Sequence, residues 1–394
     1  MNKRNVYLDN SATTQTRSEV ITEMMPYFSN IYGNASSVHT YGQKAKAALT
    51  KARETFAKLI NAQSPEEIIF TSCGTEADNI AIVGSLLAND GNHVITSKIE
   101  HHAVLFTCQN LEKHGYKADY ISTNNIGRIN IEELKSKITD DTVIVSIMHA
   151  NNEIGVMEPI EEVSKILKDI NKTRKNKILL HTDAVQTAGK IKLDVQKLGV
   201  DLLSVSGHKF YGPKGIGALY IRKGTKIEPL FHGGHHEFGM KPGTENVAGI
   251  VGMTKALELA NLEMEKENRK IFYLRKKLAD GIIEKIPEIV INTDIYSSVP
   301  NVLSVSFNYI EGETLLLMLD MAGIAASAGS ACATGSAEPS HVLSAIGANP
   351  LAAQGTLRFS LGRYNTDEDI DYVLEVLPKL VERVRQMSPI WKKR

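Results

Sequence analysis

The chain has 394 residues with 45 basic and 45 acidic side chains, so its formal net charge is zero. A chain without an excess of positive charge gives no indication of binding nucleic acid or an anionic membrane, so neither is an expected partner. The hydrophobic share of 42% and the charged share of 23% are ordinary for a globular protein, and the length allows two or three domains.

The cysteine count points to a reducing, cytoplasmic setting, because three cysteines cannot build a disulfide framework. They are Cys73, Cys108 and Cys332. The first residues contain no long apolar segment of the secretory type. Residues 314–333 come nearest to a membrane span, but Asp320 and the small polar residues after it predict a core helix followed by a loop.

The N-terminal part of the chain predicts helices and strands in alternation, with a loop at residues 30–37. We expect helices over residues 17–29, 41–60 and 72–89, and strands over 67–71 and 93–96. The strand at 67–71 runs into Gly74 and Thr75 at the start of a helix. Free backbone N–H groups and the helix dipole can bind an anion there, although Thr75 could equally be a simple helix cap.

The next expected strand, at residues 142–148, is continuously apolar, as a sheet covered on both faces requires. It brings Asn152 to its carboxyl end, which is where ligands bind in open α/β sheets. Glu153 and Gly155 read as parts of the loop structure. His101 precedes another helix, and a histidine in this position is more often a capping or surface residue than a catalytic one.

Two further strands end in residues that could carry chemistry. The strand at 177–183 ends at Asp183, whose buried carboxylate needs a cationic partner, although an N-cap for a helix starting near Ala184 is the simpler reading. The strand at 201–205 leads to Lys209. Burial lowers the pKa of an amine, and a neutral lysine can form a Schiff base. The alternative is a lysine whose stem packs while its ammonium reaches water.

The C-terminal part has fewer and only partly alternating elements, which predicts a smaller α+β domain. We expect strands over 302–307 and 357–361 and helices over 246–284, 312–320 and 366–386 in this part, whereas an expected strand at 217–221 belongs to the preceding part. The strand at 302–307 alternates and should be half-buried. The loop at 230–246 holds His232, His235 and His236, but no acidic or thiolate residue has convincing ligand spacing, so we expect no metal site.

Residues 325–337 are nearly all small, so they make few side-chain contacts and should be mobile. Cys332 lies in this stretch. A cysteine in an exposed loop is well explained as a nucleophile, because thiolate reactivity requires access. The alternative is a flexible linker with an incidental cysteine. Pro339 predicts the point where helical order resumes.

Several motifs in sequence order resemble those of one enzyme family. They are residues 7–14, Ser206-Gly-His-Lys209 followed by residues 212–217, residues 327–332, and Glu338-Pro-Ser-His341. From residue 7 to about Arg363, the chain resembles a pyridoxal-phosphate-dependent cysteine desulfurase of the NifS/IscS type, within the class V aminotransferases. The resemblance implies fold-type I, an α/β fold with a large doubly wound, mostly parallel-sheet domain and a smaller α+β domain. We expect the large domain at 16–258, and the small domain at 1–15 and 259–394 with the cysteine loop at about 325–338.

The resemblance also implies roles for residues that bind the cofactor. Lys209 would hold pyridoxal 5'-phosphate as a Schiff base and move protons together with His101, which would stack on the ring. Asp183 would keep the ring nitrogen protonated, so that the ring remains an electron sink, and Gln186 would contact the ring hydroxyl. The remaining expected cofactor contacts are Gly74, Thr75, Asn152, Ser206, His208 and, from a neighbouring subunit, Thr244.

The implied substrate is L-cysteine. Arg358 would grip its carboxylate, because a guanidinium fork binds both oxygens, and Arg363 is the second choice. Asn152 would contact both substrate and cofactor. Cys332 would take the sulfur as a persulfide, leave alanine, and swing out to an acceptor, as the long loop permits.

The expected partners are a second copy of the chain and a sulfur-acceptor protein, either an iron–sulfur scaffold or an enzyme of tRNA or cofactor thiolation. The chain departs from the family pattern at Cys73, Phe238, Lys241 and Pro242. Four alternatives remain at this point: a selenocysteine lyase, a class V transaminase, an inactive sulfur-transfer scaffold, and a metal-binding module.

Overall fold

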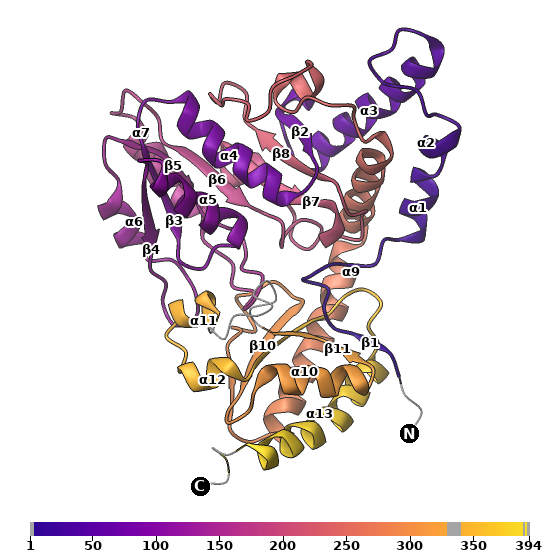
Figure 1. Cartoon of the computed structure of the whole chain (residues 1–394), viewed down its shortest axis with the longest axis vertical. Coiled ribbons are helices and arrows are strands. Elements are labelled where there is room, and N and C mark those ends of the chain that lie inside the picture. The colour runs from indigo at the N-terminus through magenta and orange to yellow at the C-terminus, as the bar shows by residue number, and fades with distance from the viewer. Residues whose placement is uncertain (1–3, 329–339, 389–390, 392–394) are drawn as a thin grey trace.

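The computed structural model describes residues 4–328, 340–388 and 391, and it contains one large and two small sheets (Figure 1). The large sheet has seven strands. Their spatial order is β2 (Ile68–Thr71), β8 (Gly217–Ile221), β7 (Leu202–Ser206), β6 (Leu179–Asp183), β5 (Thr142–Ser146), β3 (His93–Ser97) and β4 (Lys117–Ile121). Neighbours from β7 to β4 are parallel, whereas β8 runs antiparallel to both β7 and β2. The parallel strands therefore end at one common edge.

Both faces of the large sheet are buried, because successive side chains of a strand point to opposite faces. Val94 and Leu202 pack with residues of two helices on one face, and Ile95 and Leu203 pack with residues of several helices on the other. The first pair of helices is α4 (Gly74–Ala88) and α5 (His102–Lys113), and the second group includes α3 (Thr40–Leu59), α7 (Ile160–Asn171) and the first part of α9 (Val247–Lys285).

The small sheets lie at the other end of the molecule (Figure 1). One is antiparallel, in the order β12 (Ser327–Ala328), β13 (Thr356–Ser360), β10 (Val302–Phe307) and β9 (Ile289–Ile291). The other pairs β1 (Val6–Tyr7) in parallel with β11 (Ile324–Ala325). A second apolar core there combines these strands with the later part of α9, α10 (Gly312–Met321) and α13 (Asp367–Met387). The 39-residue helix α9 contributes to both cores.

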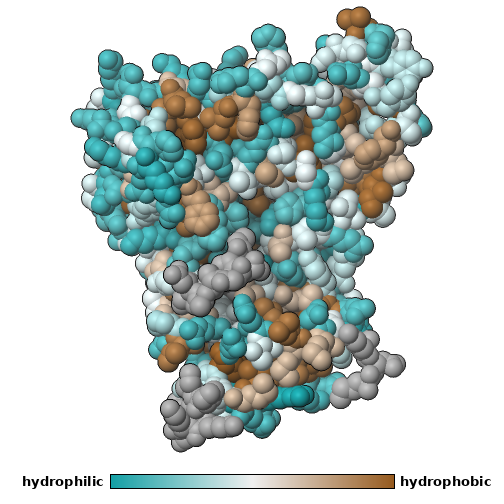
Figure 2. Space-filling view, in the orientation of Figure 1, coloured by the Kyte–Doolittle hydropathy of each residue, from teal (hydrophilic) through white to brown (hydrophobic). Residues whose placement is uncertain are grey.

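Short helices complete the fold. They are α1 (Ser18–Met24), α2 (Pro26–Ser29), α6 (Ile131–Lys137), α8 (Val195–Leu198), α11 (His341–Ala345), α12 (Pro350–Gln354), and the 3-10 turns η1 (Pro65–Glu67), η2 (Gly207–Lys209) and η3 (His236–Gly239). Figure 2 shows polar and apolar residues interspersed on one face, with apolar patches over α4 and α10. In the described part of the chain, no helix has the length and apolar character needed to cross a bilayer.

The predicted α/β class and mostly parallel large sheet are confirmed. One detail of the prediction is wrong, because β10 is buried on both faces rather than half-buried. Its polar side is closed by side-chain hydrogen bonds: Ser306 bonds Thr356 at 2.6 Å, and the Asn292 amide donates to Ser304 and Ser306. The alternation therefore indicates a polar face correctly, but Thr356 of β13 and Asn292, directly after β9, take the place of water.

Candidate active site

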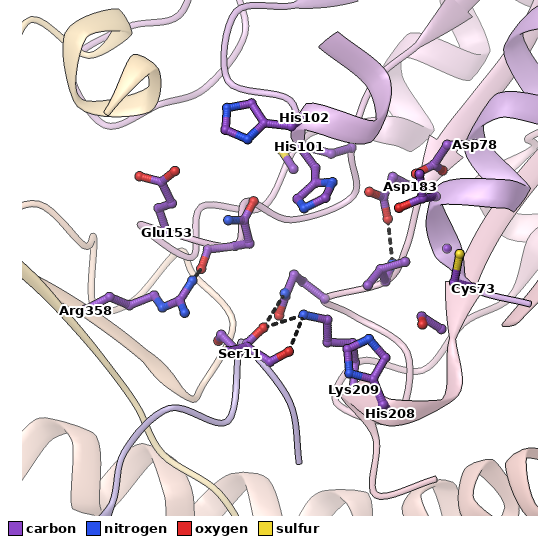
Figure 3. Close-up of a pocket in the computed structure, with 18 of the residues that line it drawn as sticks. Ser11, Cys73, Asp78, His101, His102, Glu153, Asp183, His208, Lys209 and Arg358 are labelled. Carbon is purple, nitrogen blue, oxygen red and sulfur yellow. Dashed lines mark hydrogen bonds between the residues drawn. The ribbon is translucent and has the colours of Figure 1, made fainter. Parts of the chain in front are cut away.

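A cavity of about 300 Å³ lies at the edge of the large sheet where the parallel strands end (Figure 3). This volume is within the range of small-molecule sites. Figure 3 shows that Lys209, His101, Asp183 and Arg358 surround the same space. The cavity lining includes Ser11, Ala12, Cys73, Gly74, Thr75, Asp78, His101, His102, Met148, Asn152, Glu153, Asp183, Val185, Gln186, Ser206, His208, Lys209, His341 and Arg358.

Lys209 reaches the cavity from η2, directly after β7. Its Nζ donates to the carbonyl oxygens of Ser11 at 2.7 Å and Ala12 at 2.8 Å. The N-terminal segment therefore crosses the cavity floor and holds the amine in place. A primary amine at the end of a buried strand, with room for a ligand beside it, is suited to covalent chemistry.

Asp183 ends β6 and is 5% exposed. Burial raises its pKa to about 6, against the opposing effects of the Val185 N–H and the Lys209 charge. One carboxyl oxygen accepts the Val185 N–H at 2.8 Å. The expected alternative, an N-cap of a following helix, is wrong, because residues 185–190 form turns rather than a helix. A buried carboxyl in a cavity is best stabilised by a cationic ligand.

Gln186 follows Asp183 by three positions and lines the same cavity. Its Nε2 donates to the Ser11 carbonyl at 3.1 Å. Its buried Oε1 has no hydrogen-bond partner among the described residues. An orphaned acceptor of this kind is costly unless a ligand donates to it.

His101 caps a helix and also lines the cavity. As the N-cap of α5, its Nδ1 accepts the Ala103 N–H at 3.1 Å, which places the ring proton on Nε2. Burial, with repulsion from Lys209, lowers the pKa of His101 to about 4. His101 is thus a helix cap, as one interpretation of the sequence predicts, and the same side chain also lines the cavity. A neutral imidazole in this tautomer presents its Nε2–H group as a donor.

The end of the cavity at the N-terminus of α4 is suited to an anion. The 15-residue helix α4 begins at Gly74 with its N-terminus at the cavity, and Thr75 follows. The buried Ser206 hydroxyl there has no partner within the described ranges. His208 lines the same cavity and bonds Thr13 at 3.1 Å. Helix N–H groups and an unpaired hydroxyl form a site for a phosphate.

Arg358 approaches from β13, in the small antiparallel sheet, and is 2% exposed. Its Nη1 donates to the Asn152 carbonyl and its Nη2 pairs with Asp9, both at 2.9 Å. The competing residue, Arg363, pairs with Glu263 at 3.0 Å and with Glu267 at 3.2 Å on α9. Arg358 is therefore the arginine that the fold brings to the cavity.

Three parts of the site were not anticipated. The Ser11 and Ala12 carbonyls, which hold the Lys209 amine, lie in the motif at residues 7–14, for which the sequence predicts no contact. Asp78 lines the cavity one helical turn after Gly74, a spacing that places both on one side of α4. Glu153, read as part of the loop structure, is a buried carboxyl next to Asn152, and burial raises its pKa to about 7.

Not all predicted residues are among those that line the described cavity. Cys332 falls outside the described residues, as does Pro339. Thr244 is exposed and does not line the described cavity of its own chain. Over residues 4–328, 340–388 and 391, no cluster of three or more histidine, cysteine or acidic side chains is arranged to hold a metal.

Three of the residues that depart from the family pattern make contacts near α3 and α4 or line the cavity. Cys73 precedes α4 and lines the cavity. Lys241 lies 3.7 Å from Glu76 in the first turn of α4. The Phe238 ring lies 5.1 Å from the Arg53 guanidinium, which also pairs with Glu237. The loop at 230–246 is thereby tied to α3 and α4.

Comparison with known proteins agrees with this geometry. The family profile described as aminotransferase class-V matches residues 6–373. A cysteine desulfurase IscS from Clostridium botulinum (strain Hall) is 53% identical over 395 residues, which are 99% of this chain and 98% of that protein. A solved NifS-like protein superposes with a TM-score of 0.90 at 42% identity and covers 96% of this chain and 100% of its own.

A second solved structure, SspA in complex with cysteine, has a TM-score of 0.79 at 34% identity and covers 92% of this chain and 100% of its own. The predicted family, fold-type I architecture and dependence on pyridoxal phosphate are thereby confirmed. The chain belongs to the class-V aminotransferase family and, within it, to the cysteine desulfurases.

Proposed function

We propose that this chain converts L-cysteine to L-alanine and transfers the sulfur to Cys332. The observation that carries the proposal is the meeting of Lys209, Asp183, His101 and Arg358 at one cavity, in a chain 53% identical to a cysteine desulfurase. These groups supply an amine, a carboxyl, an imidazole and a guanidinium. Together they match the reactive and charged parts of pyridoxal phosphate and of an amino acid.

The cavity residues fit the cofactor in three respects. The orphaned Gln186 Oε1 can accept from a ring hydroxyl, and the orphaned Ser206 hydroxyl can donate to a phosphate beside the N-terminus of α4. The buried Asp183 carboxyl can pair with a protonated ring nitrogen. When bound, pyridoxal phosphate supplies an electron sink for the α-carbon of the amino acid.

The chain's own residues would bind and orient the substrate as follows. Arg358 holds the carboxylate, and Asn152, fixed by its bond to Arg358, lines the same end of the cavity. Lys209 Nζ leaves the Ser11 and Ala12 carbonyls to take the proton from the substrate α-carbon. His101 lines the same cavity, and its Nε2–H group serves as a second proton donor.

Sulfur transfer requires a thiolate that attacks the substrate sulfur, and we assign this to Cys332. The new S–S bond forms as the C–S bond of cysteine breaks. The electron pair of the broken bond remains on carbon, which takes up a proton and becomes the methyl group of alanine. The sum is a thiol plus cysteine giving a persulfide plus alanine, so atoms and electrons balance without an external oxidant.

We further propose a homodimer in which Thr244 completes the phosphate site of the partner subunit. Support comes from the exposure of Thr244 and from large side chains near the start of α3, where Phe28, Tyr32 and Val38 are more than half exposed. A mixed dimer of Lys209→Ala and Thr244→Ala subunits tests this. A trans contact restores one intact site per dimer, whereas a cis contact leaves none.

The remaining proposals concern organisation and partners. We propose a large domain at 16–258 and a small one at 1–15 and 259–394, supported by separate apolar cores containing Ile95 and Leu303.

We also propose a cytoplasmic enzyme with a sulfur-acceptor protein, either an iron–sulfur scaffold or a thiolation enzyme. Pull-down with the persulfide-loaded protein would identify the acceptor.

The function is tested by alanine release from L-cysteine with a thiol reductant and no keto acid. A desulfurase releases alanine and sulfide, whereas a transaminase needs the keto acid. Lys209→Ala should abolish the visible absorbance of the bound cofactor and the activity, and the exposed Lys214→Ala is the matched control. Alanine release that requires a keto acid, or an unchanged spectrum in Lys209→Ala, would contradict the proposal. A preference for selenocysteine over cysteine would favour the lyase.

A further inference from the structure

A buried hydrogen bond joins Glu153 to Ser340, two residues that have no role in the reaction described above. The Ser340 hydroxyl donates to Glu153 Oε2 at 2.5 Å, and both residues are 5% exposed. The same hydroxyl oxygen accepts the backbone N–H groups of Val342 at 3.1 Å and Leu343 at 3.3 Å. Both lone pairs of the serine are thus in use, and its single proton is directed to Glu153.

The position of this bond relates the substrate end of the cavity to the chain that carries Cys332. Glu153 directly follows Asn152, whose carbonyl is held by Arg358. Ser340 is the first described residue after 329–339, the segment that contains Cys332. On the other side of that segment, Ser327 pairs with Arg358 across β12 and β13. Both flanks of the segment are therefore fixed to the residues around Arg358.

The helix that follows Ser340 is anchored independently of Glu153. Val342 and Leu343 of α11 pack in a buried cluster that includes Ile99, Met148 and Ile154. These apolar contacts hold α11 against the large sheet's loops. What the Glu153 bond adds is the orientation of Ser340 itself, at the point where the cysteine-bearing segment joins the helix.

We propose that Glu153 is a positioning residue for sulfur transfer. By accepting the Ser340 hydrogen bond, it fixes the downstream attachment of the Cys332 segment next to Arg358, and so sets how readily Cys332 reaches the sulfur of a bound cysteine. The inference deepens the proposed desulfurase function and rests on it. Loss of the bond slows persulfide formation while leaving the carboxylate contact at Arg358 in place.

Hydrogen bonding, rather than charge, is the property this role requires. Burial raises the pKa of Glu153 to about 7, and a carboxyl oxygen can accept the Ser340 proton in either protonation state. Glutamine keeps an acceptor oxygen at the same position but loses the charge. Leucine loses both the acceptor oxygen and the charge. Glu153→Gln is therefore the conservative variant, and Glu153→Leu is the disruptive one.

The experiment compares the two variant holoenzymes with the wild type under single-turnover conditions with L-cysteine. Sulfur on Cys332 is measured by mass spectrometry of the trapped peptide, and binding is measured separately by the cysteine-dependent change in cofactor absorbance. Because small misplacements of reacting groups are costly, Glu153→Leu should lose about tenfold or more in the rate of persulfide formation. Its absorbance change should saturate within about threefold of the wild-type cysteine concentration, and Glu153→Gln should recover most of the rate.

Several results would overturn this role. Glu153→Leu could form persulfide as fast as the wild type, or Glu153→Gln could be as slow as Glu153→Leu, which would assign the effect to charge. Equal losses of cysteine binding and of the rate of persulfide formation would place Glu153 in the substrate site instead.

If Glu153→Leu does not take up cofactor, Ser340→Ala and Ser340→Thr test the hydrogen bond from its other end, and the threonine variant should recover the rate. Absence of sulfur on Cys332 in the wild type would overturn the proposed function as well, so the two failures are distinguishable.

Discussion

The Arg358 guanidinium donates a 2.9 Å hydrogen bond to the backbone carbonyl of Asn152, which joins a strand of a small sheet to a loop of the large one. The same guanidinium pairs with Asp9 of the N-terminal segment. Three parts of the chain, distant in sequence, therefore meet at one buried cation. This arrangement holds the guanidinium of Arg358 in a fixed orientation at the cavity.

Replacement of Arg358 should weaken cysteine binding. Arg358→Lys removes the planar fork but keeps a positive charge, and we expect KM for L-cysteine to rise about 10–100-fold, the range for a lost charged hydrogen bond. Arg363→Lys is the matched control, because Arg363 pairs with Glu263 and Glu267 on α9. It should lower the melting temperature while KM changes little. Steady-state kinetics measure the effect on KM, and thermal unfolding measures the effect on stability. A larger rise in KM for Arg363→Lys than for Arg358→Lys would make Arg363 the carboxylate-binding residue.

Substitution can separate helix capping by His101 from its proposed role in proton transfer. Asparagine is a good N-cap, so His101→Asn should keep the cap of α5 and lose only the imidazole. We expect kcat to fall about 100-fold or more, as for loss of a general acid–base, while the melting temperature stays near that of the wild type. His101→Ala should lose both activity and about 1 kcal/mol of stability. Nearly full activity of His101→Asn would show that the ring serves only as a cap.

Glu100 predicts a specific dependence of stability on pH. It is fully buried, and burial raises its pKa from 4.5 to about 8. Between these values the folded chain holds a proton that the unfolded chain releases, so native stability falls as pH rises through this range. Glu100→Gln mimics the neutral acid and can still accept from Ser97 and Met148.

The expected result is a higher melting temperature for Glu100→Gln than for the wild type at about pH 8 and a similar one at about pH 5. The measurement is thermal unfolding of both proteins over this range in buffers of equal ionic strength. A difference that is constant with pH would show that ionisation of Glu100 is not the cause.

Sequence reasoning was most informative at the ends of parallel strands. Asp183, Asn152 and Lys209 follow strands whose carboxyl ends share one edge, so the topology itself brings them together. The placement of Gly74 and Thr75 at the cavity also follows from the strand-to-helix order. These positions depend on local pattern and on one general property of α/β sheets.

Other features depended on contacts that no local pattern records. The choice between Arg358 and Arg363 is decided by Glu263 and Glu267, about a hundred residues earlier, which hold Arg363 on α9. Glu153 looked like a loop residue because its partner, Ser340, lies 187 positions away. The burial of β10 likewise depends on hydrogen bonds to neighbouring strands. Each case required side chains far apart in sequence.

The most direct measurement of the central claim is the mass of the Cys332 peptide after a single turnover with L-cysteine. The account predicts one added sulfur atom on Cys332 in the wild type, formed with one equivalent of alanine. A Cys332→Ser variant should bind cysteine with the same change in cofactor absorbance but carry no sulfur at that position. Stoichiometric alanine without sulfur on Cys332, or undiminished desulfuration by Cys332→Ser, would contradict it.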